Sequence, residues 1–137
     1  MINKFENEFR FLSNFFPCQI LYEGITYPST EHAYQAAKSI DIGVRNTISK
    51  LSSPGQSKAY GRHLNLRPDW DNVKDKIMED LLRLKFQNPQ FKKMLLATND
   101  EELEEGNTWN DTYWGTCNGI GQNKLGKLLM KIREEIK

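Results

Sequence analysis

The chain has 137 residues and a mass of 16.0 kDa, which is the usual size of one domain with one core and one substrate-sized cleft. Its 19 basic and 18 acidic side chains leave a net charge of +1, which argues against a broad nucleic-acid-binding surface but leaves room for a local basic patch. No apolar run approaches the roughly 18 residues that span a membrane, and the first residues lack the apolar core of a signal peptide. We therefore expect a cytoplasmic protein with no membrane partner.

Cysteine and histidine are scarce. The two cysteines, Cys18 and Cys117, form no disulfide framework. Together with the two histidines, His32 and His63, they lie too far apart in the sequence for the three or four ligands of a typical zinc site. We expect no structural metal, and the sequence indicates no cofactor.

The N-terminal part of the chain is rich in aromatic and β-prone residues. Phe9 and Phe11 flank Arg10 with the alternation of a strand. Two β-prone runs, Cys18–Tyr22 and Ile25–Tyr27, then surround a Glu-Gly pair, and this pattern predicts a β-hairpin.

The rest of the chain predicts helices. Capping residues precede four of them: Ser29 or Thr30 for a helix to about residue 39, Ser53 before Pro54, Asp69 before the longest helix, and Asn88 before Pro89. Another helix fits residues 42–50, and a last one begins near residue 124. The longest helix is expected to bury one stripe, formed by Val73, Ile77, Leu81 and Leu84. We expect a mainly α fold in a single domain over residues 1–137, with a small N-terminal β-hairpin.

The helix from Glu31 to Lys38 is the first segment whose residues suggest chemistry. Positions seven apart differ by only about 20° around a helix axis, so Glu31 and Lys38 share a face that also carries Tyr34 and Gln35. The rise between the two ends is about 10 Å, so the charged side chains would flank a ligand rather than pair directly. The alternative is a solvated polar face. His32 points about 100° away from this face and is interpreted as a structural histidine.

A second segment, residues 104–115, combines carboxylates, amides and two tryptophans in one irregular run. Trp109 and Trp114 could stack on a base while neighbouring amides read its edge. The alternative is a capped loop whose tryptophans fill the core.

Phosphate-binding groups could come from a third segment. Gly119 and Gly121 precede the last helix, and glycines at a helix N-terminus expose backbone N–H groups that attract phosphate. The alternative is a plain glycine turn into the helix. Arg10 and Arg62 are further candidates, because a planar guanidinium binds phosphate with two hydrogen bonds; either could equally be a surface residue.

Several short motifs follow one another along the chain: Ser13-Asn14-Phe15, Tyr27-Pro28-Ser29-Thr30-Glu31-His32, Gln35-x-x-Lys38, Gly61-Arg62, Lys85-Phe86, Leu95-Leu96-Ala97-Thr98, Asn110-Asp111-x-Tyr113-Trp114-Gly115 and Asn123-x-Leu125-Gly126-x-x-Leu129-Met130. In this order they resemble the NADAR, or YbiA-like, family. The resemblance runs from about Phe9 to Arg133, which is nearly the whole chain.

This resemblance implies a mainly helical fold and N-glycosidase chemistry. The implied substrates are ribosylamino-pyrimidine intermediates of riboflavin synthesis, ADP-ribosylated guanine in a nucleoside or nucleic acid, or NAD-related metabolites. The implied catalytic residues are Glu31, Lys38 and Asp111, and the loop between Glu105 and Asn110 would set base specificity. The residues expected to bind substrate are Arg10, Ser13, Asn14, Tyr34, Arg62, Trp109, Asn110, Trp114, Gly119 and Asn123.

Cleavage of a C1′–N bond suggests a role for each catalytic residue. An ionised Glu31 would stabilise positive charge at C1′ or orient water. A neutral Lys38 could form a Schiff base with an opened sugar, which requires that burial or a nearby arginine lower its pKa. A protonated Lys38 would instead bind phosphate or ribose oxygens. Asp111 would handle protons at the base or hold the ribose hydroxyls.

Two other functions stay open at this point. The first is a non-catalytic module that binds ADP-ribose or a nucleotide in the same cleft; the combination of Glu31 with Lys38 argues against it, because binding alone does not require both. The second is a helical interaction protein, which a largely exposed Glu31/Lys38 face would favour. The sequence does not indicate an oligomeric state.

Overall fold

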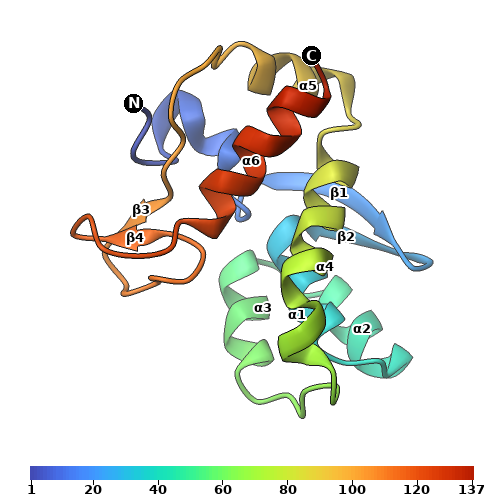
Figure 1. Cartoon of the computed structure of the whole chain (residues 1–137). Coiled ribbons are helices and arrows are strands. Elements are labelled where there is room, and N and C mark those ends of the chain that lie inside the picture. Colours follow the sequence, from blue (N-terminus) through green and yellow to red (C-terminus); the bar gives the residue numbers. More distant parts are fainter. The chain divides into compact units, whose positions relative to one another are not determined.

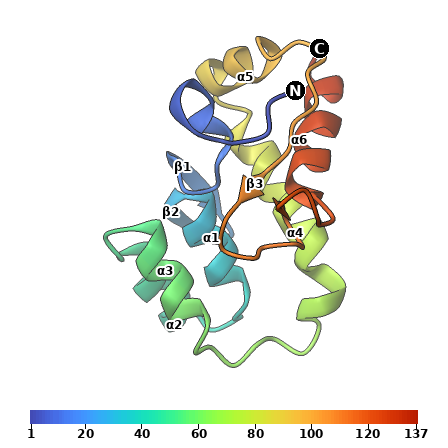
Figure 2. The ribbon, with the colours of Figure 1, turned by 90° about the vertical axis from the view of Figure 1, so that its left-hand side faces the viewer.

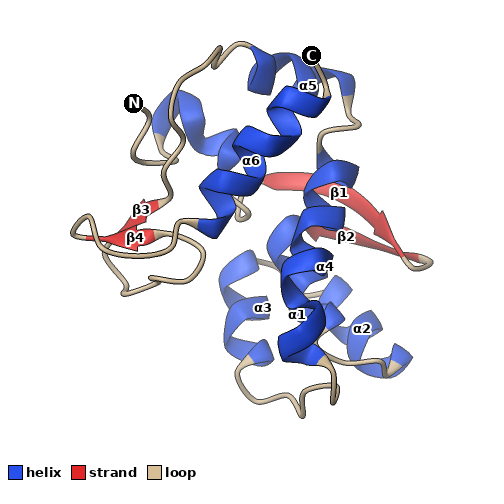
Figure 3. Cartoon of the chain, in the orientation of Figure 1, coloured by secondary structure: helices blue, strands red, loops and turns tan.

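Helices account for most of the secondary structure, as Figure 3 shows. The structure is a computed structural model that describes all residues, 1–137. Its elements in chain order are the 3-10 helix η1 (Asn7–Leu12), β1 (Pro17–Tyr22), β2 (Ile25–Ser29), α1 (Thr30–Ala37), α2 (Ile42–Ser49), α3 (Pro54–Gly61), α4 (Trp70–Lys85), α5 (Pro89–Leu96), β3 (Gly106–Asn107), β4 (Thr116–Cys117) and α6 (Lys124–Glu135). The expected mainly α fold with a small N-terminal hairpin is confirmed.

The chain folds as two compact units. We call residues Asn14–Lys85 the central unit, and Met1–Ser13 together with Phe86–Lys137 the terminal unit. The central unit contains the β1–β2 hairpin and helices α1 to α4, whereas the terminal unit contains η1, α5, α6 and the short strands β3 and β4 (Figure 1).

The hairpin forms where the sequence predicts it. Strands β1 and β2 pair antiparallel, with Ile20 opposite Tyr27 and Tyr22 opposite Ile25. Between the strands, Glu23 and Gly24 have φ values of 47° and 87°. Two successive positive φ values are typical of the tight turn whose twist matches that of the flanking strands, and glycine adopts such a value without steric cost.

Helix α1 lies at the centre of its unit. It contacts α2, α3, α4 and both strands of the hairpin, and Figure 2 shows α1, α2 and α3 close together. Ala33, Ala36 and Ala37 are fully buried, so their small side chains let the neighbouring elements approach closely. This dense packing fixes the position of every side chain that α1 carries.

Local capping signals predict the helix starts well. The Ser53 hydroxyl accepts the N–H of Gln56 at 3.1 Å, with Pro54 in the first turn. Asn88 Oδ1 accepts two N–H groups at the start of α5. The longest helix begins directly after Asp69 as expected, but that carboxylate pairs with Arg67 instead of capping the helix, at 2.7 Å and 3.2 Å.

The longest helix, α4, buries a broader face than the predicted stripe. Ile77 and Leu81 are buried as expected, whereas Val73 and Leu84 are half-buried. The face continues through buried Met78, Leu82 and Lys85. An ammonium group therefore lies in the interior at the C-terminal end of α4.

The terminal unit corrects one expectation. Phe9, Arg10 and Phe11 belong to the helix η1, so the strand predicted for them is wrong. In η1 Phe11 is buried while Arg10 is exposed, and one helical turn produces this alternation as readily as a strand. The remaining core of this unit includes Leu95 and Leu129, both fully buried.

None of the helices is both long and apolar enough to cross a membrane.

Candidate active site

Glu31 lies in the first turn of α1 and is held there by backbone hydrogen bonds. The Ser29 hydroxyl caps the helix by accepting the N–H of His32 at 3.0 Å. The carbonyl of Asn14 accepts the N–H of Glu31, also at 3.0 Å. Glu31 is only 8% exposed, so its carboxylate acts in surroundings of low polarity, where charges interact more strongly than in water.

The polar face of α1 is buried, not solvated. Every residue from Thr30 to Ala37 is buried, and Gln35 Nε2 donates a 2.7 Å hydrogen bond to Glu31 Oε1 one turn earlier. The interpretation of this face as a solvated surface is therefore wrong. The largely exposed face that would favour an interaction protein is also absent.

Lys38 follows α1 directly and keeps helical backbone angles, with φ −62° and ψ −21°. Its side chain therefore stays on the face that carries Glu31. Burial lowers the pKa of the Lys38 ammonium group, and the Glu31 carboxylate partly opposes this. The neighbouring cations Arg62, Lys58 and Lys74 lower the pKa further. The neutral form of the Lys38 amine is consequently more populated than that of an exposed lysine at the same pH.

Two of these cations lie in α3 or directly after it. Lys58 is half-buried, and its Nζ lies 6.0 Å from the centre of the Phe15 ring. Arg62 is exposed and directly follows the last residue of the helix. Both act electrostatically on Lys38, so the α3 side of this face has the positive charge that attracts phosphate groups.

Aromatic and amide groups complete the cluster in the central unit. Tyr34 packs on Trp70, with ring centres 5.2 Å apart, and Lys38 Nζ lies 6.0 Å from the centre of the Tyr34 ring. Asn14 Nδ2 donates to Met78 Sδ at 3.5 Å, whereas its Oδ1 is buried without a partner. A buried acceptor without a partner is uncommon.

His32 has a structural role, as its direction from the predicted face suggested. Its Nε2 lies 3.0 Å from the Leu51 carbonyl and its Nδ1 lies 2.6 Å from the Ser29 hydroxyl. Because a carbonyl can only accept, Nε2 carries the proton and Nδ1 accepts from Ser29. Burial lowers the pKa of His32, so the neutral ring links the start of α1 to the segment after α2.

In the terminal unit, Asn107 organises the loop between β3 and β4. Its Oδ1 accepts the N–H groups of Trp109 and Asp111, at 3.3 Å and 3.1 Å. Its Nδ2 donates to the Asp111 carbonyl at 2.9 Å and to Glu105 Oε2 at 3.0 Å. The sequence places several amides in this run and carries no signal that singles out Asn107, so its role cannot be predicted from the sequence.

Asp111 is fixed within this loop. Its Oδ1 accepts the N–H groups of Tyr113 and Trp114, at 3.2 Å and 3.0 Å. These two bonds orient the carboxylate and leave Oδ2 for another donor. The rings of Tyr113 and Trp114 meet edge to face with centres 5.0 Å apart, so Trp114 is half-buried against its neighbour.

Trp109 is the most exposed tryptophan of the loop, at 58%. The alternative, in which both tryptophans fill the core, is therefore wrong for Trp109. The next residue, Asn110, is also exposed and has a φ of 63°, a value that asparagine tolerates better than most residues. This sharp bend presents both side chains to solvent.

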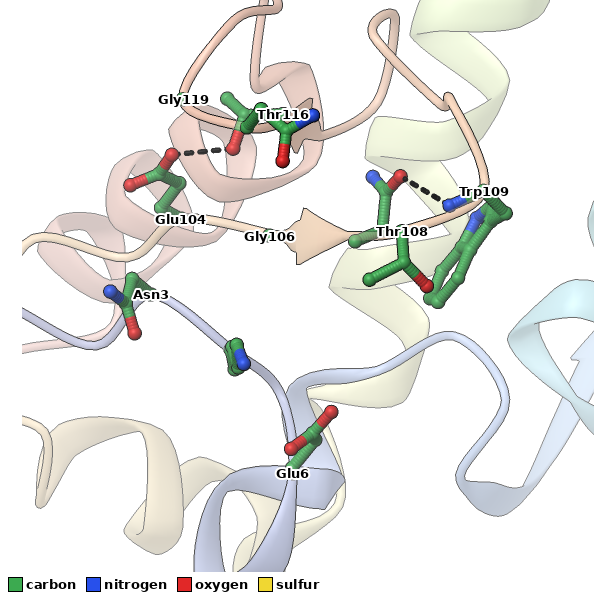
Figure 4. A pocket seen from close by; sticks show the side chains of 11 residues that line it. Asn3, Glu6, Glu104, Gly106, Thr108, Trp109, Thr116 and Gly119 are labelled. Carbon is green, nitrogen blue, oxygen red and sulfur yellow. Dashed lines mark hydrogen bonds between the residues drawn. The ribbon is translucent and has the colours of Figure 1, made fainter.

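A pocket of about 370 Å³ lies within the terminal unit, beside this loop. Trp109 and Gly119 line it, together with residues of the N-terminal segment such as Glu6 (Figure 4). Figure 4 also shows Thr116 donating a hydrogen bond to Glu104 in the pocket wall. Two of the predicted binding residues thus share one hollow.

The start of α6 does not offer the predicted phosphate site. The N–H groups of Asn123, Lys124 and Leu125 already donate to the carbonyls of residues 115, 113 and 114, respectively. The Asn123 side chain bridges two backbone groups, the Glu105 N–H at 3.0 Å and the Leu103 carbonyl at 2.9 Å. Gly121, with a φ of 150°, packs against the backbone of residues 112, 115 and 116. This segment is a glycine turn into a helix, as the alternative stated.

The remaining predicted residues of the terminal unit lie in or beside η1. Arg10 is an exposed residue of this helix, and the N–H of Ser13 donates to the Arg10 carbonyl at 2.9 Å. No group of three or more histidine, cysteine, aspartate or glutamate side chains is arranged to hold a metal ion.

The structure therefore brings five of the predicted site residues together in the central unit: Asn14, Glu31, Tyr34, Lys38 and Arg62. The other eight belong to the terminal unit: Arg10, Ser13, Trp109, Asn110, Asp111, Trp114, Gly119 and Asn123. The sequence does not indicate the role of Asn107 or the hydrogen bond from Gln35 to Glu31, although helical periodicity places Gln35 on the right face.

Comparisons with known proteins agree with these observations. Residues 2–137 match the family model described as the NADAR domain. N-glycosidase YbiA of Escherichia coli is 41% identical over 128 residues, which cover 90% of this chain and 79% of that protein. A riboflavin biosynthesis protein of Vibrio vulnificus is 38% identical over 130 residues, which cover 92% of this chain and 35% of that protein. The NMR structure of E. coli YbiA matches with a TM-score of 0.85 and 37% identity, over 99% of this chain and 86% of that one.

Proposed function

The chain belongs to the NADAR family, and we propose that it is an N-glycosidase that hydrolyses the C1′–N bond of a ribosylated or ADP-ribosylated base. The observation that carries the proposal is the buried Glu31 carboxylate on the same helix face as the half-buried Lys38 amine. The N-glycosidase name of the E. coli relative supports it.

Glu31 acts on the sugar. Breaking the C1′–N bond leaves positive charge on C1′ and the ring oxygen, and a fixed carboxylate in surroundings of low polarity stabilises that charge. The same carboxylate can orient a water molecule toward C1′. In this route the hydroxide of water bonds to C1′ as the bond to the base breaks, and the departing base nitrogen takes the proton.

Lys38 supplies a second route, through a covalent intermediate. At the ordinary lysine pKa of about 10.4 nearly every amine is protonated at neutral pH, but burial lowers the pKa of Lys38. When the ribose ring opens, the C1′–O4′ bond breaks, O4′ takes the proton of the glycosidic N–H, and a C1′=N bond to the base remains. The neutral Lys38 nitrogen then adds to C1′ and its two protons pass to the base nitrogen. The base leaves as an amine when its bond to C1′ breaks, and a C1′=N bond to Lys38 remains. Water then hydrolyses the resulting imine and restores the amine.

The substrate is a nucleotide-like small molecule or an ADP-ribosylated guanine in a nucleoside or nucleic acid. In the central unit, exposed Arg62 binds phosphate and the Asn14 amide binds the ribosyl part of the substrate. Base recognition falls to Trp109, Trp114 and Asn110, and proton transfer at the base to Asp111. The riboflavin biosynthesis name of the Vibrio relative supports a ribosylamino-pyrimidine.

The test supplies both substrate classes. Purified protein is incubated with ADP-ribosylated guanosine and, separately, with a ribosylamino-pyrimidine phosphate, and base release is followed by mass spectrometry. One aliquot of each reaction receives borohydride, which reduces an imine to a stable adduct. Lys38→Ala, treated in the same way, is the control for the site of the adduct.

Each outcome assigns a function. Base release from one substrate identifies its class, and a reduced adduct on Lys38 that is absent from Lys38→Ala establishes the covalent route. Release without an adduct establishes attack by water, with a protonated Lys38 binding phosphate or ribose oxygens of the substrate. Micromolar binding of ADP-ribose without release from either substrate would contradict the proposal and establish a non-catalytic binding module.

A further inference from the structure

Gly61 is a helical glycine whose backbone does not require glycine. It is the last residue of α3 and is absent from the residues with positive φ, which include only three glycines. Glycine in a helix loses more conformational freedom on folding than alanine does. A reason other than backbone conformation must therefore explain the glycine at this position.

That reason is the side-chain amide of Gln35. A Cβ built on Gly61 would overlap Gln35 Oε1 and also contact the amide carbon. The hydrogen that glycine carries in place of a side chain consequently faces Oε1, where it can act as a weak C–H donor. Gly61 is itself buried, so Gln35 cannot move outward into solvent to make room.

The orientation of this amide is fixed by its other end. Gln35 Nε2 donates to Glu31 Oε1 at 2.7 Å, and a carboxylate oxygen can only accept. Rotating the amide by 180° would place two oxygens against each other. The orientation that serves Glu31 therefore leaves Oε1 buried and without a conventional hydrogen-bond partner.

The orphaned Oε1 is informative about the role of Gln35. The residue is only 4% exposed, and burying an amide oxygen without a partner opposes folding. An apolar side chain of similar length would fill this space without that loss. The feature that an apolar side chain lacks is the N–H group directed at Glu31.

We propose that Gln35 is the positioning residue for the Glu31 carboxylate, and that Gly61 is the specific residue in α3 that lets the Gln35 amide reach it. This inference rests on the proposed role of Glu31 in C1′–N cleavage. Gln35 does not touch the reacting atoms. Its hydrogen bond to one oxygen of Glu31 fixes the orientation of the carboxylate relative to the bound sugar.

The first test removes the donor and keeps the volume. Gln35→Met has a side chain of similar length that lacks the N–H group. We expect kcat for base release to fall about 100-fold, as misplacement of a catalytic group by about 1 Å can cause, with little change in KM or in the thermal unfolding midpoint. A kcat equal to that of the wild-type protein would overturn the proposal.

The second test addresses Gly61 with a matched control from the same helix. Gly55 lies in the first turn of α3, and a Cβ there would meet only Ser53 Oγ at an ordinary 3.9 Å. We expect Gly61→Ala to lower both the unfolding midpoint and kcat, and Gly55→Ala to change neither. Equal effects of the two substitutions would overturn the role of Gly61.

A double substitution separates positioning from packing. Shortening Gln35 to alanine makes room for a Cβ at position 61, so Gly61→Ala combined with Gln35→Ala should regain the unfolding midpoint lost in Gly61→Ala. Because the donor is still missing, kcat should stay low. Recovery of kcat together with the midpoint would show that Gln35 serves packing alone, and would refute the proposal.

Glu31→Gln, assayed beside these variants, separates the two levels of inference. If Glu31→Gln keeps the kcat of the wild-type protein, the proposed function of Glu31 is wrong. If Glu31→Gln loses turnover while Gln35→Met keeps it, the role of Glu31 stands and only the positioning role of Gln35 is wrong.

Discussion

Lys85 gives a quantitative prediction about the pH dependence of folding. This residue ends α4 and is only 1% exposed, and burial lowers the pKa of its ammonium group from 10.5 to about 8. Between these two pH values the unfolded chain binds a proton that the folded chain does not. The free energy of unfolding therefore rises with pH across this interval.

The size of the effect follows from the two pKa values. At about 1.4 kcal/mol for each pH unit, the interval from about 8 to 10.5 corresponds to about 3 kcal/mol. Below pH 8 both states are protonated, so the contribution of Lys85 levels off at its least favourable value. Above pH 10.5 both states are neutral and the contribution levels off again.

Lys85→Met removes the titrating group while keeping a long side chain. Urea unfolding of both proteins is measured from pH 7 to pH 11, and the free energy of the variant is subtracted from that of the wild-type protein. Other titrating groups cancel in this difference, which should rise by about 3 kcal/mol between pH 8 and pH 10.5. A difference that stays constant over this range would refute the assignment of a lowered pKa to Lys85.

Three further predictions concern the site. Arg62→Ala should raise KM for a phosphate-containing substrate several-fold at unchanged kcat, and an unchanged KM would remove Arg62 from substrate binding. The yield of borohydride-trapped adduct should increase with pH and approach a plateau below pH 10.5, because the lowered pKa of Lys38 increases the neutral fraction as pH rises; a yield that decreases with pH would contradict nucleophilic attack by this amine. Asn107→Ala should lower the free energy of unfolding by about 1–3 kcal/mol in a denaturant titration, because backbone groups that it bonds lose their partner; an unchanged value would show that the loop does not depend on it.

Features encoded by neighbouring residues could be predicted from the sequence. Three helices are capped by Ser29, Ser53 and Asn88, and each cap accepts an N–H group from a residue two or three positions later. The capping signal is therefore contained in a few consecutive residues. The hairpin is similarly local, because its turn is set by Glu23 and Gly24. The shared face of Glu31 and Lys38 follows from helical geometry alone.

Features that depend on packing between elements could not be predicted. Nothing near Gln35 in the sequence indicates that its amide contacts Gly61, because the two residues meet only when α1 packs on α3. The burial of Glu31 has the same origin, since a helix N-terminus is equally compatible with solvent. Phe9 and Phe11 were ambiguous for a local reason. Their three-residue pattern fits a strand as well as the 3-10 helical turn that forms.

The loop between β3 and β4 has features of both kinds, some predictable from local sequence and some that depend on the folded structure. Its composition indicated a site with tryptophans and amides, and the structure presents Trp109 to solvent. Which amide organises the loop depends on five hydrogen bonds made by the Asn107 side chain, and these require the folded backbone. The glycine turn before α6 depends on the carbonyls of residues 113–115, which take the N–H groups that a phosphate would need.

The most direct test of the account measures base release by Glu31→Gln and Lys38→Ala beside the wild-type protein, with the substrate that the wild-type protein cleaves. Circular dichroism and the unfolding midpoint establish that both variants are folded. We expect each variant to bind substrate and to release no base above the uncatalysed rate. Near-normal release by either folded variant would contradict the claim that this buried carboxylate and this amine carry the chemistry.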